Sequence, residues 1–336
     1  MAAKVYDTII LGGGPAGLSA AVYMGRFLRS TLVIDAGRGR AAGHQLNENY
    51  LGFPKGIKVR RLRELGRQQA ARFGVEFCDC SVIDITKSDT CFIVECSGDM
   101  SFQGKQLIVA TGVSDIWPAF PYVERYIGKS LFWCITCDGY KMQDRAVLLL
   151  GNTDEAAITA LQFLRFTDKL TMLAHPDHNT ICPERLDDLK RNNIRLIEAE
   201  ITRVKGAAGS IDAVQLSNDE ALQPDVLFSL YGKIPNSQLV AGLGVMLNPE
   251  GYIEIDENQQ TNVAGVFAAG DVTGAHAHQI ACAVHEGAMA ASAANYALYP
   301  PLQRHDTAEQ GPIRREGKVK ATKKAKDKGK GIKAKG

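Results

Sequence analysis

The stretch VYDTIILGGGPAGLSAAVYMGRFLRSTLVID, residues 5–35, decides how this chain folds. An apolar run ends in glycines spaced GxGxxG (Gly12, Gly14 and Gly17), a helical pattern follows, and a second apolar run closes at Asp35. Such glycines permit a tight turn and let backbone amides approach a pyrophosphate at a helix N-terminus, while the acid can bind ribose hydroxyls. The stretch therefore predicts a βαβ unit that binds a dinucleotide.

The length and composition predict a globular protein with two domains. The chain has 336 residues, of which 45% are hydrophobic and 23% charged, and so long a chain usually exceeds one core. Eight irregularly spaced cysteines fit a reducing compartment. No targeting pattern precedes the first strand and no apolar run has the length of a membrane span, so we expect a cytoplasmic protein without membrane contact.

The charge is uneven along the chain. Residues 314–336 carry nine Lys and two Arg against two acids, a balance of +9, which leaves 28 basic and 35 acidic residues, or −7, in the rest. We expect residues 304–336 to form a basic, disordered tail, because Lys, Gly and Ala leave little to bury. The tail is either a solvated terminus or an electrostatic lure for an acidic macromolecule. No pattern in the rest of the chain suggests that it recognises nucleic-acid bases, so a nucleic-acid partner is not expected.

A second signal is the stretch WCITCDGY, residues 133–140. Cys134 and Cys137 are spaced to close a small disulfide ring, and the carboxylate of Asp138 could pass protons as the ring opens. Half of a zinc site, a structural disulfide or a redox pair would all fit this spacing. Zinc needs a second pair of ligands, which the scattered remaining cysteines do not supply, so we expect no metal.

Further segments in collinear order resemble one known family. The chain is similar, from residue 5 to about residue 300, to the low-molecular-weight thioredoxin reductases of the FAD-dependent pyridine nucleotide-disulfide oxidoreductase superfamily. The segments that carry the resemblance are GGGPAG, the Gln45-Leu46 pair, the Asn49-x-x-Gly-Phe-Pro segment, Ala110-Thr111-Gly112, CITCDG, Gly232-x-x-Pro235-Asn236 and GVFAAGD ending at Gly270-Asp271.

The resemblance implies an α/β fold with two Rossmann-like three-layer nucleotide-binding domains, the second inserted in the first. It places the FAD-binding domain at residues 1–117 and 243–303, and an inserted NADPH-type domain that carries the CxxC at residues 118–242. Asp271 would lie on the ribityl chain of FAD and Gln279 near the flavin ring. The residues expected to bind FAD are Gly12, Gly14, Pro15, Ala16, Gly17, Asp35, Gln45, Leu46, Asn49, Ala110, Thr111, Gly112, Gly270, Asp271, Gln279 and Ile280.

The family also implies roles for the residues of the CxxC segment. Cys137 would exchange electrons with the flavin, Cys134 would form a mixed disulfide with thioredoxin or a thioredoxin-like protein, and Asp138 would act as general acid and base. A homodimer is implied by the resemblance as well.

The second nucleotide-binding turn departs from the family pattern. Its GxGxxA keeps Gly151 and Ala156, but the middle glycine is Thr153, whose Cβ stands where a pyrophosphate must approach the backbone. After the next predicted strand, the family's His-Arg-Arg clamp for a 2′-phosphate is replaced by His175-Pro-Asp177. We therefore expect that NADPH is not used, and that a ferredoxin-type protein or another donor supplies electrons.

Three other interpretations stay open at this stage. The first is a divergent NAD(P)H-dependent reductase that accepts, for example, NADH. The second is a dithiol oxidase that passes electrons from a dithiol through CxxC and FAD to oxygen, although its known representatives commonly carry His where this chain has Asp138. The third is a redox sensor without turnover.

Overall fold

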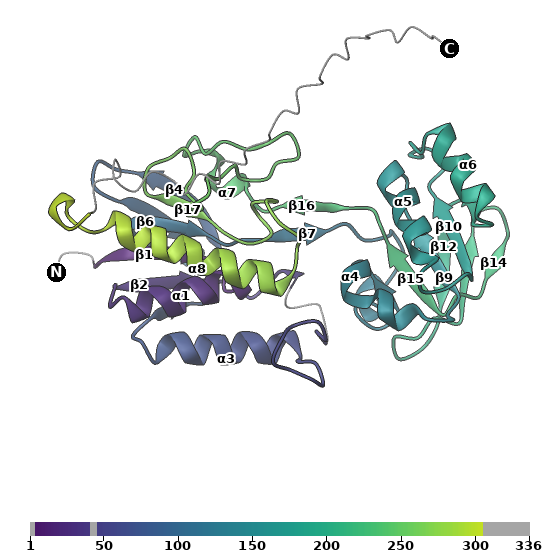
Figure 1. Ribbon diagram of the computed structural model, residues 1–336, viewed down its shortest axis with the longest axis horizontal. Helices are drawn as coiled ribbons and strands as arrows, with labels where there is room; N and C mark the ends of the chain where they lie inside the picture. Colours follow the sequence, from purple (N-terminus) through teal and green to yellow (C-terminus); the bar gives the residue numbers. More distant parts are fainter. Residues whose placement is uncertain (1–3, 41–45, 305–336) are drawn as a thin grey trace, which may run out of the picture. The chain divides into compact units, whose positions relative to one another are not determined.

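A seven-stranded sheet draws its strands from both ends of the part of the chain that the computed structural model describes, residues 4–40 and 46–304 (Figure 1). Its order is β3-β2-β1-β6-β5-β4, and β17 also pairs with β6. The pairs of β1 with β2 and β6 are parallel, whereas β4, β5 and β6 pair antiparallel. The bounds are β1 (Val5–Leu11), β2 (Thr31–Ile34), β3 (Glu76–Cys78), β4 (Val82–Lys87), β5 (Phe92–Cys96), β6 (Met100–Val109) and β17 (Val266–Ala268).

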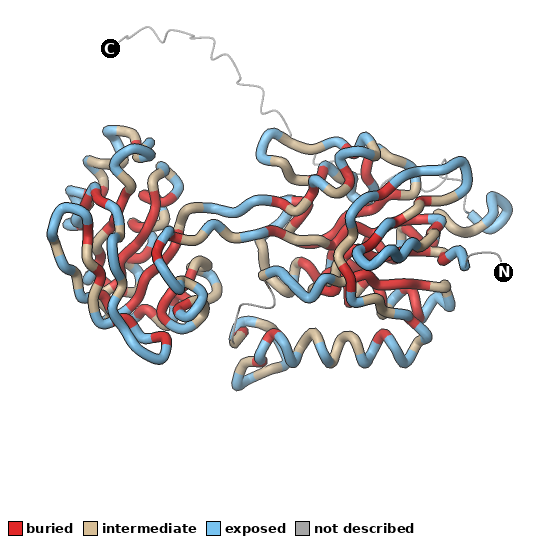
Figure 2. The backbone as a smooth tube through the Cα atoms, turned by 180° about the vertical axis from the view of Figure 1, so that it is seen from behind, coloured by how far each residue is buried: buried red, intermediate tan, exposed pale blue. Residues whose placement is uncertain are grey.

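Alternation along β1 gives this sheet two buried faces. Ile10 packs with the helices α1 (Pro15–Arg26) and α8 (Ile280–Ala297), whereas Ile9 and Leu11 point into the core on the opposite face. A third helix, α3 (Val59–Ala71), packs against α1. Figure 2 shows the buried residues concentrated on the strands and on the inner sides of these helices.

The second sheet has five parallel strands in the order β11-β10-β9-β15-β8. Helices α5 and α6 share one core with it, and the antiparallel sheet β12-β13-β14 shares the core on the other face. The bounds are β8 (Leu131–Phe132), β9 (Val147–Leu150), α5 (Asp154–Phe163), β10 (Leu170–Ala174), α6 (Pro183–Arg191), β11 (Arg195–Glu198), β12 (Ile201–Lys205), β13 (Ala213–Leu216), β14 (Ala221–Leu222) and β15 (Val226–Ser229).

The two sheets are connected by a pair of short antiparallel strands, β7 (Val113–Asp115) and β16 (Lys233–Pro235). Because the whole second sheet falls between them in the chain, it is an insertion into the first. The predicted architecture of two Rossmann-type α/β units, one inserted in the other, is confirmed. The remaining short helices are η1 (Val123–Arg125), α4 (Ile135–Asp138), η2 (Gly139–Met142), α7 (Gln238–Ala241) and η3 (Pro301–Gln303).

Two boundaries differ from those that the local sequence predicts. Residues 106–112 have the pattern of one strand, but β6 already begins at Met100, because its first half pairs with β5 in a hairpin. The helical pattern that leads to α3 continues to Gly74, but α3 ends at Ala71, and Gly74 follows in a turn with φ +78°. In the described ranges, no helix is both long and apolar enough to span a membrane. Gln45 lies outside the described residues, and so does the predicted tail except for Arg304.

Candidate active site

In the first glycine turn, between β1 and α1, two glycines are tightly packed and one leaves its backbone accessible. Gly12 has φ +110°, and a Cβ there would lie 2.3 Å from the carbonyl oxygen of Ala110. A Cβ at Gly17 would lie 1.9 Å from the carbonyl oxygen of Gly12, whereas a Cβ at Gly14 would meet no atom within 4 Å. Gly12 and Gly17 are therefore required by the fold itself, and Gly14 leaves backbone open to a bound group.

A cavity of about 420 Å³ opens at this turn. It is bounded by the ends of β1 and β6, by the turn that follows β17, and by the start of α8. Fourteen of the predicted site residues line it, namely Gly12, Gly14, Pro15, Ala16, Asp35, Ala110, Thr111, Gly112, Cys134, Cys137, Gly270, Asp271, Gln279 and Ile280. Gly17, Leu46, Asn49 and Asp138 are not part of this lining.

Three arginines that no motif marked, Arg38, Arg40 and Arg63, also line the cavity. Arg40 lies between two acids, with Nη1 2.9 Å from Oδ2 of Asp271 and Nε 3.0 Å from Oδ2 of Asp115. Burial raises the pKa of Asp271, and the nearby guanidinium of Arg40 partly offsets this effect. In the same way, Nη2 of Arg63 donates to Oδ2 of Asp35 at 2.6 Å, so the acid expected to take ribose hydroxyls has a cation as its partner here.

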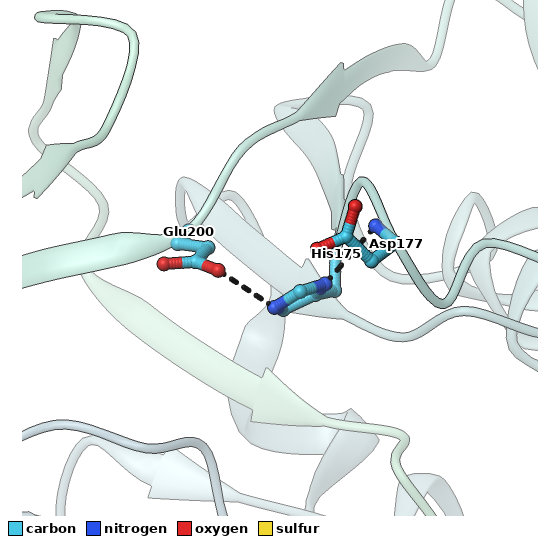
Figure 3. Close-up of side chains that lie close together, drawn as sticks. All are labelled: His175, Asp177 and Glu200. Carbon is cyan, nitrogen blue, oxygen red and sulfur yellow. Dashed lines mark hydrogen bonds and ion pairs between the residues drawn. The ribbon is translucent and has the colours of Figure 1, made fainter.

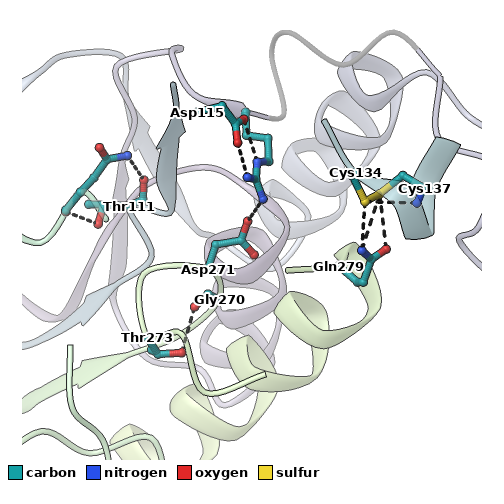
Figure 4. A network of polar contacts seen from close by, with 10 residues as sticks. Thr111, Asp115, Cys134, Cys137, Gly270, Asp271, Thr273 and Gln279 are labelled. Atoms are coloured by element: carbon teal, nitrogen blue, oxygen red, sulfur yellow. Dashed lines mark hydrogen bonds and ion pairs between the residues drawn. A yellow bond between two sulfur atoms is a disulfide. The ribbon is translucent and has the colours of Figure 1, made fainter. Parts of the chain in front are cut away.

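The sulfur atoms of Cys134 and Cys137 form a disulfide at the wall of the cavity. Cys134 is the N-cap of α4, and its Sγ accepts a hydrogen bond of 3.1 Å from the backbone N–H of Cys137. The side-chain amide of Gln279 faces both sulfurs, with Nε2 3.5 Å from Sγ of Cys134 and 3.6 Å from Sγ of Cys137 (Figure 4). Nδ2 of Asn49 donates to Oε1 of the same amide at 2.9 Å and so orients it.

The predicted acid and base, Asp138, lies buried directly after the disulfide ring and is 1% exposed. Its Oδ1 accepts a hydrogen bond of 2.9 Å from Nζ of Lys141, and the same ammonium lies 2.9 Å from Oε2 of Glu48. Burial acts to lower the pKa of Lys141, but its hydrogen bonds to the two carboxylates outweigh this effect and raise it. Neither Lys141 nor Glu48 belongs to a motif that sequence reasoning could have used.

His278, which precedes Gln279, brings a neutral ring to the cavity wall. Burial, together with the positive charges of Lys233 and Arg40, lowers the pKa of His278 to about 4. Within the described part of the chain, its buried Nδ1 has no hydrogen-bond partner. The His278 ring thus carries no charge at neutral pH.

The residues at the cavity fit FAD. Bare backbone at Gly14, at the start of α1, suits a pyrophosphate, and Asp35 and Asp271 offer oxygens to ribose and ribityl hydroxyls. Cys137 and Gln279 line the same cavity and would adjoin a flavin ring there. A disulfide beside such a group can take up or release an electron pair.

Known proteins of similar sequence and structure support this chemistry. Residues 6–294 match the family described as pyridine nucleotide-disulphide oxidoreductase. The thioredoxin reductase of Treponema pallidum (strain Nichols) is 32% identical over 299 residues, which cover 86% of this chain and 96% of that protein. A 34.2 kDa protein in the rubredoxin operon of Clostridium pasteurianum is 32% identical over 300 residues, 86% of this chain and 96% of its own length.

Solved structures agree with the sequence relatives. The thioredoxin reductase from Streptococcus pyogenes MGAS5005 superposes with a TM-score of 0.81 at 27% identity, covering 88% of this chain and 98% of that one. The family match spans nearly the whole described chain and contains both glycine turns and the disulfide. The chain therefore belongs to the pyridine nucleotide-disulphide oxidoreductases, within the low-molecular-weight thioredoxin reductase family, and is an FAD-dependent oxidoreductase.

Proposed function

We propose that this enzyme moves electron pairs between FAD and a thioredoxin-like protein through Cys134 and Cys137, and that its electron donor is not NAD(P)H. The observation that carries the first part is the position of the disulfide, since both sulfurs line the cavity that fits FAD and contact Gln279. Relatives named thioredoxin reductase support a thioredoxin-like partner.

The residues of the chain would divide the work as follows. Bound FAD supplies a two-electron store next to the disulfide. Opening the Cys134–Cys137 bond takes two electrons and two protons and gives two thiols. Attack by Cys134 on a partner disulfide and then by Cys137 on the mixed disulfide reforms the bond, and the partner leaves with both thiols. Asp138, directly after Cys137, would accept and return protons.

The state of the second nucleotide turn supports a donor other than NAD(P)H. The two loops between which a dinucleotide would lie are joined to one another by hydrogen bonds. Oδ1 of Asn152 accepts from the backbone N–H of His175 at 2.7 Å, and the Asn152 carbonyl oxygen accepts from both Thr180 N–H at 2.7 Å and Thr180 Oγ1 at 2.9 Å. Oδ1 of Asp154 accepts from Cys182 N–H at 2.8 Å. These bonds fix the two loops to each other beside the turn at which the family binds a pyrophosphate.

The helix end at this turn is also occupied. Thr153 caps α5 with its own side chain, whose Oγ1 accepts from the backbone N–H of Ala156 at 3.3 Å. The first turn of α5 carries Asp154 and Glu155, and acids at a helix N-terminus occupy the place that favours phosphate. The carboxylates of Asp154 and Glu155 thus already lie at the positive N-terminal end of α5.

At the neighbouring position, where a 2′-phosphate clamp is expected in the family, the chain has a histidine between two acids (Figure 3). Nδ1 of His175 accepts from the backbone N–H of Asp177 at 3.2 Å, and its Nε2 lies 2.9 Å from Oε1 of Glu200. The ligand atoms of these three residues lie within 4.8 Å of one another, as in some metal sites. In this arrangement Nδ1 of His175 accepts a hydrogen bond and Nε2 faces the carboxylate of Glu200. The two carboxylates would repel a 2′-phosphate.

Anaerobic stopped-flow spectroscopy of the FAD-loaded enzyme tests the proposal with four reductants. We expect dithiothreitol and a reduced ferredoxin to bleach the flavin, and NADPH and NADH to leave it oxidised on the same time scale. Rapid stoichiometric bleaching by NADPH would refute the donor assignment. No bleaching by dithiothreitol would refute electron exchange with the disulfide, and sustained oxygen uptake with dithiol alone would favour the dithiol oxidase.

Three further expectations belong to the same proposal. The strands support an FAD domain at residues 1–117 and 243–303 with the CxxC domain at 118–242, because these two ranges hold the strands of the first and the second sheet. A homodimer and a cytoplasmic location follow the resemblance. Light scattering during gel filtration tests the homodimer, and fractionation of the cells tests the location.

A further inference from the structure

The ammonium of Lys141 joins two carboxylates that belong to different parts of the site. It lies 2.9 Å from Oδ1 of Asp138, three residues before it on the disulfide segment, and 2.9 Å from Oε2 of Glu48, in the loop that leads to α3. The side chain of Lys141 is 28% exposed, that of Asp138 1% and that of Glu48 47%. The contact with Asp138 is thus shielded from water, and the contact with Glu48 lies at the surface.

The loop that carries Glu48 meets the disulfide segment a second time. Asn49 donates to Oε1 of Gln279, whose Nε2 faces the two sulfurs. The loop is closed at its base by paired backbone hydrogen bonds between Asn47 and Ile57, of 2.9 and 2.8 Å. Within one closed loop, Glu48 therefore contacts the disulfide segment at Lys141, and the adjacent Asn49 is linked to the sulfur atoms through Gln279.

The charge on Lys141 affects what Asp138 can do. Burial without a partner penalises a carboxylate and favours its protonated form, and a cation at hydrogen-bond distance reverses this preference. Lys141 faces Asp138 from η2, Glu48 faces the same ammonium from the loop, and the sulfurs of Cys134 and Cys137 lie at the start of α4. In this arrangement the Lys141 ammonium lies 2.9 Å from Oδ1 of the acid that follows Cys137.

We propose that Lys141 is a positioning residue that acts through Asp138, and that Lys141 and Glu48 together form an electrostatic clasp that holds the disulfide against the FAD cavity. The Lys141–Asp138 contact lies within the disulfide segment, and the Lys141–Glu48 contact joins that segment to the loop. This inference rests on the proposed function in that it assigns Asp138 to proton transfer. Its test reads the thiols directly, so it does not depend on the identity of the donor or on bleaching of the flavin.

The first measurement is the rate at which a water-soluble phosphine reduces the disulfide, followed by maleimide trapping and mass spectrometry. The phosphine and one water give the phosphine oxide and the two thiols of Cys134 and Cys137. Because an ion pair near the surface is weak, we expect reduction to be about twofold to fivefold faster in Glu48→Gln. Lys141→Met should be at least as fast, and the double variant no faster than Lys141→Met. High salt should accelerate the wild type but not these variants.

The matched control is Lys105→Met, which removes an ion pair of 2.8 Å between Lys105 and Asp7. These two residues are far from the disulfide segment in sequence, and the Lys105 side chain is 54% exposed. We expect the wild-type rate for this variant. If Glu48→Gln and Lys141→Met also reduce at the wild-type rate, the clasp does not exist. Additive effects of the two substitutions would likewise overturn it, because they would show independent contacts.

The second measurement separates the effect on Asp138 from the clasp. The rate of reduction by dithiothreitol is measured in the same way between about pH 5.5 and 8.5 and is expressed as the ratio of variant to wild type, which cancels the ionisation of the reagent. We expect the ratio for Lys141→Met to rise by roughly threefold as the pH falls, since a protonated Asp138 can give its proton to the leaving sulfur. Glu48→Gln should give a flat ratio, and Lys141→Arg should restore the wild-type profile.

Adding Asp138→Asn to Lys141→Met should abolish the pH dependence of the ratio. A flat ratio for Lys141→Met itself would refute the positioning role even if the clasp is found. The same outcome would leave the proposed reductase function untouched, because that function is tested by electron exchange with the flavin.

Discussion

Replacing Gln279 by leucine should make the Cys134–Cys137 couple harder to reduce by about 30–60 mV. Nε2 of Gln279 lies 3.5 and 3.6 Å from the two sulfurs, and a disulfide sulfur is a weak acceptor. After reduction the same N–H groups face a thiolate, and a hydrogen bond to a charged group contributes about 1.5–3 kcal/mol. In a two-electron couple, about 1.4 kcal/mol corresponds to 30 mV. The amide therefore stabilises the reduced form, and its loss lowers the potential.

The potential is measured by equilibrating the FAD-loaded protein anaerobically in dithiothreitol redox buffers at about pH 8.5, where thiolates are populated. Trapping with maleimide and mass spectrometry give the fraction reduced. Gln68→Leu serves as the control, since Gln68 is exposed on α3 and bonds to Glu64 at 3.3 Å. The reasoning is refuted if Gln279→Leu and Gln68→Leu have the same potential, or if Gln279→Leu is easier to reduce.

Asn49→Asp tests the orientation of the amide within the same experiment. Asn49 donates to Oε1 of Gln279, which lies 3.7 Å from Sγ of Cys137, while Nε2 lies 3.5 and 3.6 Å from the two sulfurs. A carboxylate at position 49 accepts instead of donating, so the Gln279 amide should turn and present Oε1 to the sulfurs. We expect a potential at least as low as that of Gln279→Leu. An unchanged potential would show that Asn49 does not set this orientation.

Four other substitutions have results that we expect from the structure. Gly17→Ala should destabilise the protein by about 1–3 kcal/mol in thermal unfolding, because its Cβ would lie 1.9 Å from the Gly12 carbonyl oxygen. Gly14→Ala should unfold at the same temperature as the wild type in the absence of FAD, but should bind FAD about tenfold more weakly in a fluorescence titration. Arg40→Met should cost about 2–3 kcal/mol at neutral pH. The pKa of Asp271 is raised from 3.8, so its contribution to stability is present below that value and lost as the pH rises through the raised pKa; the deficit of Arg40→Met in denaturant titrations should therefore shrink toward about pH 4. The pKa of His278 is lowered from 6.5 to about 4, so the contribution of His278 to stability is present above pH 6.5 and is lost as the pH falls toward 4. In the same denaturant titrations, His278→Gln should therefore be more stable than the wild type at about pH 4.5 and equally stable at about pH 8.

The parts of the site that could be predicted are those that local spacing encodes. Gly12, Gly14 and Gly17 follow one another within a single turn, so their order in the chain already states the shape of the backbone. The same holds for Cys134 and Cys137, whose separation of three residues sets the size of the ring. For such residues, the neighbours in space are also neighbours in sequence.

The parts that escaped prediction are contacts between distant segments. Arg40 meets Asp271 across 231 positions of the chain, and Arg63 meets Asp35 across 28. A charged residue in a loop or on an amphipathic helix has the same pattern whether it faces solvent or a cavity. Asp35 shows the consequence, since its place at the end of β2 was predicted from the motif, but its arginine partner was not.

The loop that follows the first βαβ unit explains why the recognisable motifs of this chain are not sufficient for its site. Its consecutive residues Asn47, Glu48 and Asn49 line the FAD cavity, pair with Lys141 and orient Gln279, in that order. Gly56, with φ +70°, allows the loop to close, since a Cβ there would lie 2.9 Å from Cγ of Glu48. The cavity that fits FAD, the Lys141–Asp138 pair and, through Gln279, the disulfide thus all adjoin one short segment. In this chain, the glycine and cysteine motifs mark the cavity and the disulfide, and this loop contacts both of them.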